Sequence, residues 1–389
     1  MNNFLILTSL FCGVIALISV VWILVPAPFY HVWLYSVAVS EWSLWFGIIA
    51  LFGVILALFD YTLHKNSGVA IIAVIIGVTA FLISLYPFFT SLKVAGEKNV
   101  SLSFGQYFGA LTNSKSNNKF TTHVFKNGEN ALKMDVYAPN KFSANGASVI
   151  VIHGGSWNAG ERNDFSQWNV WLAEKGFSGF DIYYTIAPQP KDKTAIGDVK
   201  CAILQIKKRS AEFNISPDKI VLLGRSAGGH LALIAAYSTN DSRLSASCNE
   251  SGNDEKVRAV VSFYAPTDLL WAFDNPANRR VINGAQTLSN FLGGNPHDSE
   301  EIRARFASAS PVERVNTNSP PTLLMHGEQD QLVRKENLNF LAAKLEQNNI
   351  AHETLVIPYG QHGFDYNFNG WASQIAKPVI LEFLIKNTK

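Results

Sequence analysis

Cysteine is scarce in this sequence, with only 3 in 389 residues. Cys12, Cys201 and Cys248 lie far apart and form no C-x-x-C pair, so neither a structural zinc site nor a framework of several disulfides is predicted. A bridge between Cys201 and Cys248 is conceivable only if that part of the chain faces an oxidising compartment. The sequence therefore predicts no bound metal and no disulfide scaffold.

Charged residues are also few, at 16% against roughly 25% in a typical soluble chain. The 32 Lys and Arg residues nearly balance the 30 Asp and Glu residues, which argues against nucleic acid as a partner. The deficit is confined to residues 1–90, where only Glu41, Asp60 and Lys65 are charged. The sequence thus divides into an apolar N-terminal part and a remainder with an ordinary charge content.

Three long uncharged runs, 4–25, 42–59 and 69–89, fill the N-terminal part. Their lengths match, or nearly match, a helix that crosses the hydrocarbon core of a bilayer. Residues 26–41 between the first two runs are rich in Phe, Tyr and Trp, which favour the headgroup level of a membrane. We therefore predict a multi-pass membrane anchor over residues 1–91, with a lipid bilayer as partner. The runs contain no Asp, Glu, Lys or Arg, so they offer no path for protons or ions.

The charges beside these runs leave the membrane side of the remaining chain open. Three spans would place the two chain ends on opposite sides. Lys65 lies between the second and third runs, whereas Lys93 and Lys98 follow the third. By the positive-inside rule, this difference of one charge favours a cytoplasmic location for the residues that follow.

The rest of the chain divides into a linker and one large domain. Residues 92–119 mix Gly, Ser, Asn and Lys and are predicted to be a linker with one short element near 104–111. Strands are expected at 120–125, 131–137 (a hairpin through Asn127-Gly128), 148–152, 179–184, 219–223, 257–264, 321–325 and 353–357, and helices at 165–175, 195–213, 227–238, 335–347 and 371–385. This alternation predicts an α/β domain over 120–389, with a mostly parallel sheet and helices on both faces. Residues 268–320 exceed a plain crossover and are expected to cap the C-terminal edge of the sheet.

A nucleophile motif occurs at the junction of a predicted strand and helix. Gly224-Arg225-Ser226-Ala227-Gly228 fits the G-x-S-x-G pattern, and it follows a strand and opens a helix, as that motif requires. Its glycines permit a sharp turn with close backbone contacts. Ser226 is therefore the predicted nucleophile; the alternative is an ordinary strand-to-helix turn.

A serine hydroxyl needs a base, and His362 is the best-placed candidate. It lies in Gly360-Gln361-His362-Gly363, directly after the last predicted strand, where a side chain can reach the nucleophile. The other histidines downstream of Ser226 are His230, His297, His326 and His352. We expect His230 to pack against its own helix and His326 to be structural, so neither competes with His362.

The base in turn needs a carboxylate that holds its tautomer and stabilises its positive charge. Asp330 lies in the loop after a predicted strand, and the chain order Ser226, Asp330, His362 is the order of the hydrolases that carry this motif. Glu328 is the nearest rival and is expected to be a solvated loop carboxylate.

Hydrogen-bond donors for a developing oxyanion are also recognisable. His153-Gly154-Gly155 follows the strand at 148–152, and its glycines leave backbone N–H groups accessible. The N–H of Ala227, next to the nucleophile, is the third predicted donor. The P-loop, G-x-G-x-x-G and H-E-x-x-H patterns are absent, so no nucleotide, dinucleotide or metal cofactor is predicted.

Together these residues resemble the α/β-hydrolase superfamily, and within it the hormone-sensitive-lipase and feruloyl-esterase-like groups with an H-G-G oxyanion loop. The matching segments are Met134 to Pro139, His153 to Trp157, Ala187-Pro188, Asp198, Gly224 to His230, Ser310-Pro311, Gly327 to Asp330 and Gly360 to Gly363. The family usually has Asp-Tyr-Arg where this chain has Tyr183-Tyr184-Thr185, so an internal ion pair is expected to be missing near the site.

The resemblance implies an α/β-hydrolase fold with a small cap, preceded here by three transmembrane helices. It also implies a serine hydrolase that cleaves carboxylic esters through Ser226, His362 and Asp330, with a small-molecule, lipid or acylated-polymer ester as substrate and no cofactor. An acyltransferase or amidase using the same three residues is the enzymatic alternative. A non-catalytic membrane interaction protein that retains the hydrolase fold is the other. The sequence determines neither the acyl and alcohol groups nor the oligomeric state.

Overall fold

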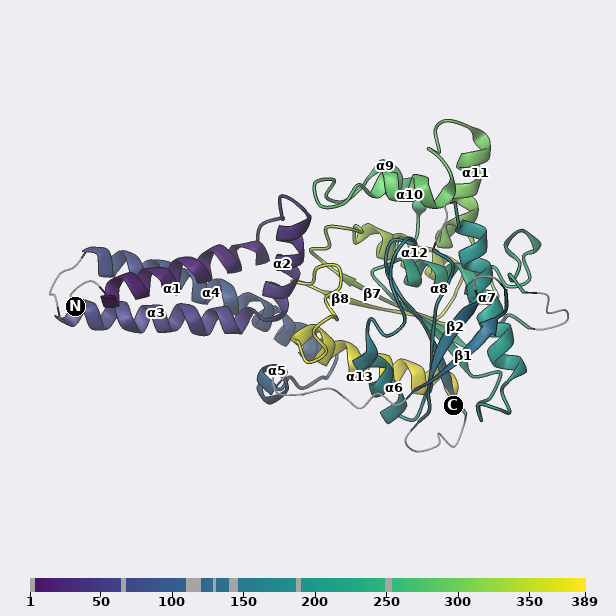
Figure 1. The fold of residues 1–389 in the computed structure, drawn as a ribbon, viewed down its shortest axis with the longest axis horizontal. Coiled ribbons are helices and arrows are strands. Elements are labelled where there is room, and N and C mark those ends of the chain that lie inside the picture. Colours follow the sequence, from purple (N-terminus) through teal and green to yellow (C-terminus); the bar gives the residue numbers. More distant parts are fainter. Residues whose placement is uncertain are drawn as a thin grey trace.

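The computed structural model describes residues 4–63, 68–109, 120–128, 131–139, 146–186, 190–248 and 254–389. Part of the predicted linker (110–119), part of the predicted hairpin (129–130) and the Ala187-Pro188 motif lie outside these ranges. Within them, one eight-stranded sheet forms the centre of the domain (Figure 1). Its strands are β1 (Thr121–Lys126), β2 (Leu132–Tyr137), β3 (Ser148–Ile152), β4 (Ser178–Ile182), β5 (Ile220–Arg225), β6 (Ala259–Phe263), β7 (Thr322–Gly327) and β8 (His352–Ile357).

The sheet has the order β1-β2-β4-β3-β5-β6-β7-β8. From β4 to β8 all neighbours are parallel, whereas β1 and β2 are antiparallel and form one edge. Parallel strands buried on both faces are mostly apolar, as β3 illustrates after Ser148: its side chains at 150 and 152 belong to the core on one face, and those at 149 and 151 to the core on the other. The predicted α/β-hydrolase fold is confirmed.

Helices cover both faces of the sheet (Figure 1). The first face packs against α7 (Asp192–Lys208), α8 (Ala227–Tyr237) and α12 (Glu336–Gln347). The second packs against α6 (Ser166–Glu174) and α13 (Trp371–Thr388). Between β6 and β7, the segment predicted as a cap contains α9 (Leu269–Asp274), α10 (Gly284–Leu292) and α11 (Glu300–Ala309).

Three N-terminal helices, α1 (Phe4–Val20), α3 (Ser43–Leu63) and α4 (Gly68–Glu97), form a bundle that projects from the domain (Figure 1). Each of the three is long and apolar enough to cross a membrane, and the first of these spans includes the 3-10 turn η1 (Val21–Ile23) that follows α1. Small residues line their contacts. A Cβ added at Gly53 would lie 3.0 Å from the carbonyl oxygen of Ser9, and one at Gly77 would lie 2.6 Å from Val54. Such close packing of small residues is typical of helices that associate in lipid.

Two predicted boundaries in this region differ from the structure. α4 continues to Glu97, although the third run was predicted to end at 89 and the linker to begin at 92. The helix continues because Val94 and Ala95 are buried in the core on the second face of the sheet. Residues 30–41 of the aromatic interval form a helix, α2 (Tyr30–Glu41), and the short predicted element is α5 (Phe104–Gly109).

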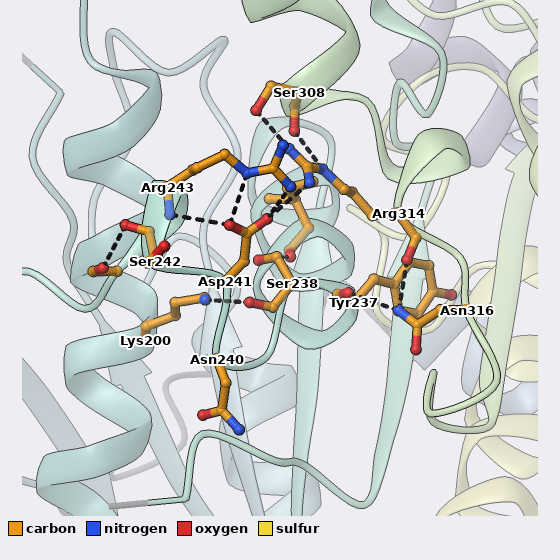
Figure 2. A network of polar contacts seen from close by, with 12 residues as sticks. Lys200, Tyr237, Ser238, Asn240, Asp241, Ser242, Arg243, Ser308, Arg314 and Asn316 are labelled. Carbon is orange, nitrogen blue, oxygen red and sulfur yellow. Dashed lines mark hydrogen bonds and ion pairs between the residues drawn. The ribbon is translucent and has the colours of Figure 1, made fainter. Parts of the chain in front are cut away.

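A polar network fixes the end of α8 that is distant from the nucleophile (Figure 2). Asp241 accepts hydrogen bonds from Arg243 and from Arg314, which lies after α11. The Arg243 hydrogen bonds lower the pKa of Asp241 to about 2. Buried Lys200 of α7 donates to the carbonyl of Ser238 at 2.6 Å. These contacts join α8 to its neighbours and hold in place the helix that follows Ser226.

One disulfide joins Cys201 of α7 to Cys248, and their Cα atoms are 5.5 Å apart. The sequence alone left this pairing conditional on an oxidising environment. Cys201 is fully buried, so the bridge lies against the core on the first face of the sheet. It fastens the segment that follows α8 to the helix beside it.

Candidate active site

Ser226 occupies a strained turn between β5 and α8. Its backbone has φ 54° and ψ −119°, outside the regions that a residue with a side chain prefers. The flanking glycines are required by contact: a Cβ at Gly224 would lie 2.2 Å from the carbonyl oxygen of Gly228, and one at Gly228 would lie 2.2 Å from that of Ile152. This turn has the geometry that the sequence predicted for a nucleophile elbow, and the strain is typical of a functional turn.

The structure brings the three predicted catalytic side chains into one hydrogen-bonded chain. His362 Nε2 lies 2.8 Å from Ser226 Oγ, and His362 Nδ1 lies 2.7 Å from Asp330 Oδ2. A carboxylate can only accept, so Nδ1 carries the proton and Nε2 accepts the hydroxyl proton of Ser226. These residues follow β5, β7 and β8, whose C-terminal ends meet at one edge of the sheet.

The surroundings of Asp330 keep its carboxylate ionised. Oδ1 accepts hydrogen bonds from the N–H groups of Leu332 and Val333 at 2.8 and 2.9 Å. Oδ2 faces His362 and also His326, whose Nε2 is 3.2 Å away. Burial by itself would raise the pKa of Asp330, but the charge and hydrogen bonds of His362 and the hydrogen bond of His326 outweigh burial and hold the pKa well below its ordinary value.

A second buried cluster packs against His362 and was not predicted from the sequence. The ring of Tyr264 lies 4.4 Å from that of His362, centroid to centroid, and the Tyr264 hydroxyl donates to Asp365 at 2.6 Å. Asp365 also pairs with Arg225 at 2.6 Å, and the Arg225 guanidinium lies 4.1 Å from the ring of Phe165. Arg225 is the variable position of the elbow motif, so no motif could have signalled this contact.

The predicted oxyanion donors lie beside Ser226. A Cβ at Gly154 would lie 3.4 Å from Ser226 Cβ and 3.0 Å from the carbonyl oxygen of Arg225, so only glycine fits there without displacement. Gly155 has φ 110°, a conformation that favours glycine. Ala227 is the first residue of α8, where N–H groups have no partner within the helix.

The remaining histidines have other partners. His230 is fully buried; it accepts a hydrogen bond from Trp157 Nε1 at 3.2 Å and donates one to the carbonyl of Ala309 at 2.8 Å. Burial lowers its pKa to about 4. His297 pairs with exposed Asp274, and His352 contacts the carbonyl of Ile350. His326 was expected to be structural, and its Nε2 lies 2.9 Å from the carbonyl oxygen of Val333; the same atom also lies 3.2 Å from Asp330 Oδ2.

Two further expectations concern charged groups near the site. Glu328, the rival acid, forms an ion pair with Lys335 and is not part of the hydrogen-bonded chain.

The expected loss of an ion pair near Thr185 is wrong. The Thr185 N–H donates to buried Asp198 at 2.9 Å, and Lys126 of β1 pairs with the same carboxylate at 2.6 Å. A lysine from the edge strand thus supplies a cation beside the divergent segment.

Two cavities meet at Ser226 and His362. The first, about 590 Å³ including space open to solvent, extends beneath the cap between Trp157 and Leu288. The second, about 1460 Å³ including its open mouth, extends from Gly154 and Gly155 toward α2. An ester bound across Ser226 can therefore extend in two directions.

Comparison with known proteins assigns the chain to a family. A protein-family model named BD-FAE matches residues 134–345, more than half of the chain. The chain belongs to the BD-FAE family. The BD-FAE match spans most of the α/β-hydrolase domain and includes the elbow and Asp330.

Relatives and solved structures give the same fold. The chain is 28% identical to "Probable carboxylic ester hydrolase LipM" over 60% of its length and 53% of LipM, and 29% identical to "Esterase LipC" over 60% of its length and 57% of LipC, both of Mycobacterium tuberculosis. It thus spans about half the length of the curated relatives it matches. The esterase Est2 of Thermogutta terrifontis superposes with a TM-score of 0.56 at 22% identity, covering 69% of this chain and 92% of Est2. An acetyl ester-xyloside bifunctional hydrolase of Caldicellulosiruptor lactoaceticus gives 0.57 at 21% identity, covering 68% and 96%.

Proposed function

We propose that this protein is a membrane-anchored serine hydrolase that cleaves carboxylic esters. The observation that carries the proposal is the hydrogen-bonded chain from Ser226 through His362 to Asp330, with both links shorter than 3 Å. Membership of the BD-FAE family and relatives named as esterases support ester hydrolysis as the reaction.

The reaction follows from the positions of these groups. Ser226 Oγ attacks the ester carbonyl carbon while His362 Nε2 takes the hydroxyl proton. The N–H groups of Gly154, Gly155 and Ala227 stabilise the resulting oxyanion. When the intermediate collapses, the bond to the alcohol oxygen breaks and that oxygen takes the proton from His362. Water then attacks the acyl-enzyme with His362 again as base, which releases the acid and restores the serine.

Substitution of the nucleophile tests this proposal. Ser226→Ala in the full chain in detergent should lower kcat/KM for p-nitrophenyl acetate by about 10⁴-fold or more. The same variant should lose covalent labelling by a fluorophosphonate probe, whereas Ser242→Ala, a change at an exposed serine, should retain labelling. Retention of activity and labelling by Ser226→Ala would refute the assignment of the nucleophile.

We also propose that the three apolar helices span a membrane and that the catalytic domain lies on its oxidising side. The Cys201–Cys248 disulfide supports this side, because such bridges persist mainly in oxidising compartments. The positive-inside rule favoured a cytoplasmic location instead, but only by the difference of one charge between Lys65 on one side and Lys93 and Lys98 on the other. A buried disulfide that joins two segments of the domain is the stronger observation.

A further inference from the structure

The helix α2 lies between the bundle of α1, α3 and α4 and the catalytic domain, beside the loops that carry the site (Figure 1). Its residues Trp33, Leu34 and Val37 line the larger cavity, whose other wall contains Ser226 and His362. One wall of the space next to the nucleophile therefore comes from the N-terminal region and not from the hydrolase domain.

The segment that leads into α2 is fastened to the catalytic loops. The N–H of Ala27 donates to the side chain of Gln331 at 2.8 Å, and the Gln331 amide donates to Gln361 at 3.2 Å. Gln331 follows Asp330 directly, and Gln361 precedes His362 directly. These buried hydrogen bonds hold α2 in a fixed position relative to Asp330 and His362. A segment that only linked the bundle to the domain would not need them.

Apolar packing holds the helix in the same place. Trp33 and Val37 are buried in a small cluster with Ala27 and Val281, against which Leu332 also packs. Val281 belongs to the segment between α9 and α10, so α2 contacts the cap as well as the catalytic loops. The position of the cavity wall is thus determined from two sides.

The mouth of the cavity is continuous with the apolar surface of the N-terminal region. Tyr30 and Leu34 both line the cavity and are each 45% exposed. Phe29 and Tyr35 beside them are exposed as well, and the exposed side chains of the bundle are mostly apolar. Aromatic residues at this level fit the headgroup region of a bilayer into which the bundle inserts.

We propose that α2 forms the specificity-determining wall of the substrate site and that the substrate is an ester carried by a membrane-resident amphiphile. Its apolar chain enters between Tyr30 and Leu34 from the bilayer and lies along α2, while its short group lies beneath the cap. This inference rests on the proposed hydrolase function and adds the substrate class to it.

The test uses a substitution that narrows the mouth of the larger cavity. Full-length Leu34→Trp, reconstituted in phosphatidylcholine vesicles, is compared with wild type on p-nitrophenyl palmitate, hexadecyl acetate and water-soluble p-nitrophenyl acetate. The ratio of kcat/KM for a long-chain ester to kcat/KM for p-nitrophenyl acetate should fall at least about tenfold, the effect of excluding two or so methylene groups from contact. The palmitate tests a long acyl chain, and the hexadecyl ester tests a long alcohol.

Leu24→Trp is the matched control, because Leu24 is 47% exposed and does not line the cavity. Its ratios should equal those of wild type. A selective fall in Leu34→Trp for either long-chain ester supports the inference. Unchanged ratios for both, or equal falls in the control, overturn it while leaving the hydrolase function standing. A wild type that cleaves none of the three esters refutes the hydrolase function itself.

Discussion

The substitution Asp330→Asn separates the tautomer-holding role of the carboxylate from its packing role. The asparagine oxygen can keep the two hydrogen bonds that Oδ1 accepts from the N–H groups of Leu332 and Val333. The amide nitrogen then takes the place of Oδ2 and presents N–H groups to His362. His362 Nδ1 must then accept, so Nε2 carries the proton and cannot take the proton of Ser226.

The expected loss follows from this change of tautomer. We expect kcat for p-nitrophenyl acetate to fall by about 10³- to 10⁴-fold, which corresponds to about 4–5.5 kcal/mol of lost transition-state stabilisation. The fold should persist, because the shape and the backbone contacts of the side chain are retained. Some stability is still lost, about 1.5–3 kcal/mol, since a charge-assisted hydrogen bond becomes unfavourable.

The assay measures kcat and KM for p-nitrophenyl acetate with the full chain in detergent, together with the melting temperature of each variant. Glu328→Gln is the matched control, since Glu328 is the neighbouring carboxylate that pairs with Lys335. The control should keep kcat within about twofold, as expected of a partly exposed ion pair. If Asp330→Asn retains more than a tenth of wild-type kcat, or if Glu328→Gln shows the larger loss, the assignment of the acid is refuted.

Two further predictions concern stability and membrane side. The pKa of buried His230 is lowered to about 4 from about 6.5, so its contribution to stability is complete above pH 6.5 and is lost as the pH falls toward 4. Relative to His230→Asn, wild type should lose about 2 kcal/mol of unfolding free energy between pH 8 and pH 5 in chemical denaturation. Taking the difference between the two proteins cancels the contribution of Asp181, whose raised pKa of about 7 has the opposite effect on stability. A difference that does not vary with pH would contradict the assignment of the pH effect to His230. In cells, Cys201 and Cys248 should resist alkylation under denaturing conditions until a reductant is added, and immediate alkylation of both would place the domain on the reducing side.

The sequence predicted the elements that form the site because each is encoded by neighbouring residues. The elbow at Gly224–Gly228 is a five-residue pattern with a strand before it and a helix after it. Asp330 and His362 each follow a recognisable buried strand, and parallel strands bring their C-terminal ends to one edge. The hydrophobic runs in the first 90 residues were equally recognisable, because a helix that could cross a bilayer needs a long continuous apolar stretch.

Contacts between distant segments leave no such pattern. Nothing near His326 indicates that its imidazole would reach Asp330, and nothing near Arg225 indicates a pair with Asp365. α4 extends past its predicted end only because Val94 and Ala95 are buried against another part of the chain. These contacts depend on which surfaces meet after the sheet has formed.

The sequence by itself predicted the reactive groups: a serine, an imidazole and a carboxylate in a chain order that one fold can unite, joined to helices apolar enough for a membrane. Only the tertiary structure decided where the N-terminal part would lie. The helix α2 forms a wall of the cavity beside Ser226 because the N–H of Ala27 donates a hydrogen bond to Gln331 and Trp33 packs in a cluster with Val281 of the cap. Reactivity is set by local groups, which a sequence records, whereas the shape of the substrate site is set by packing between segments more than a hundred residues apart.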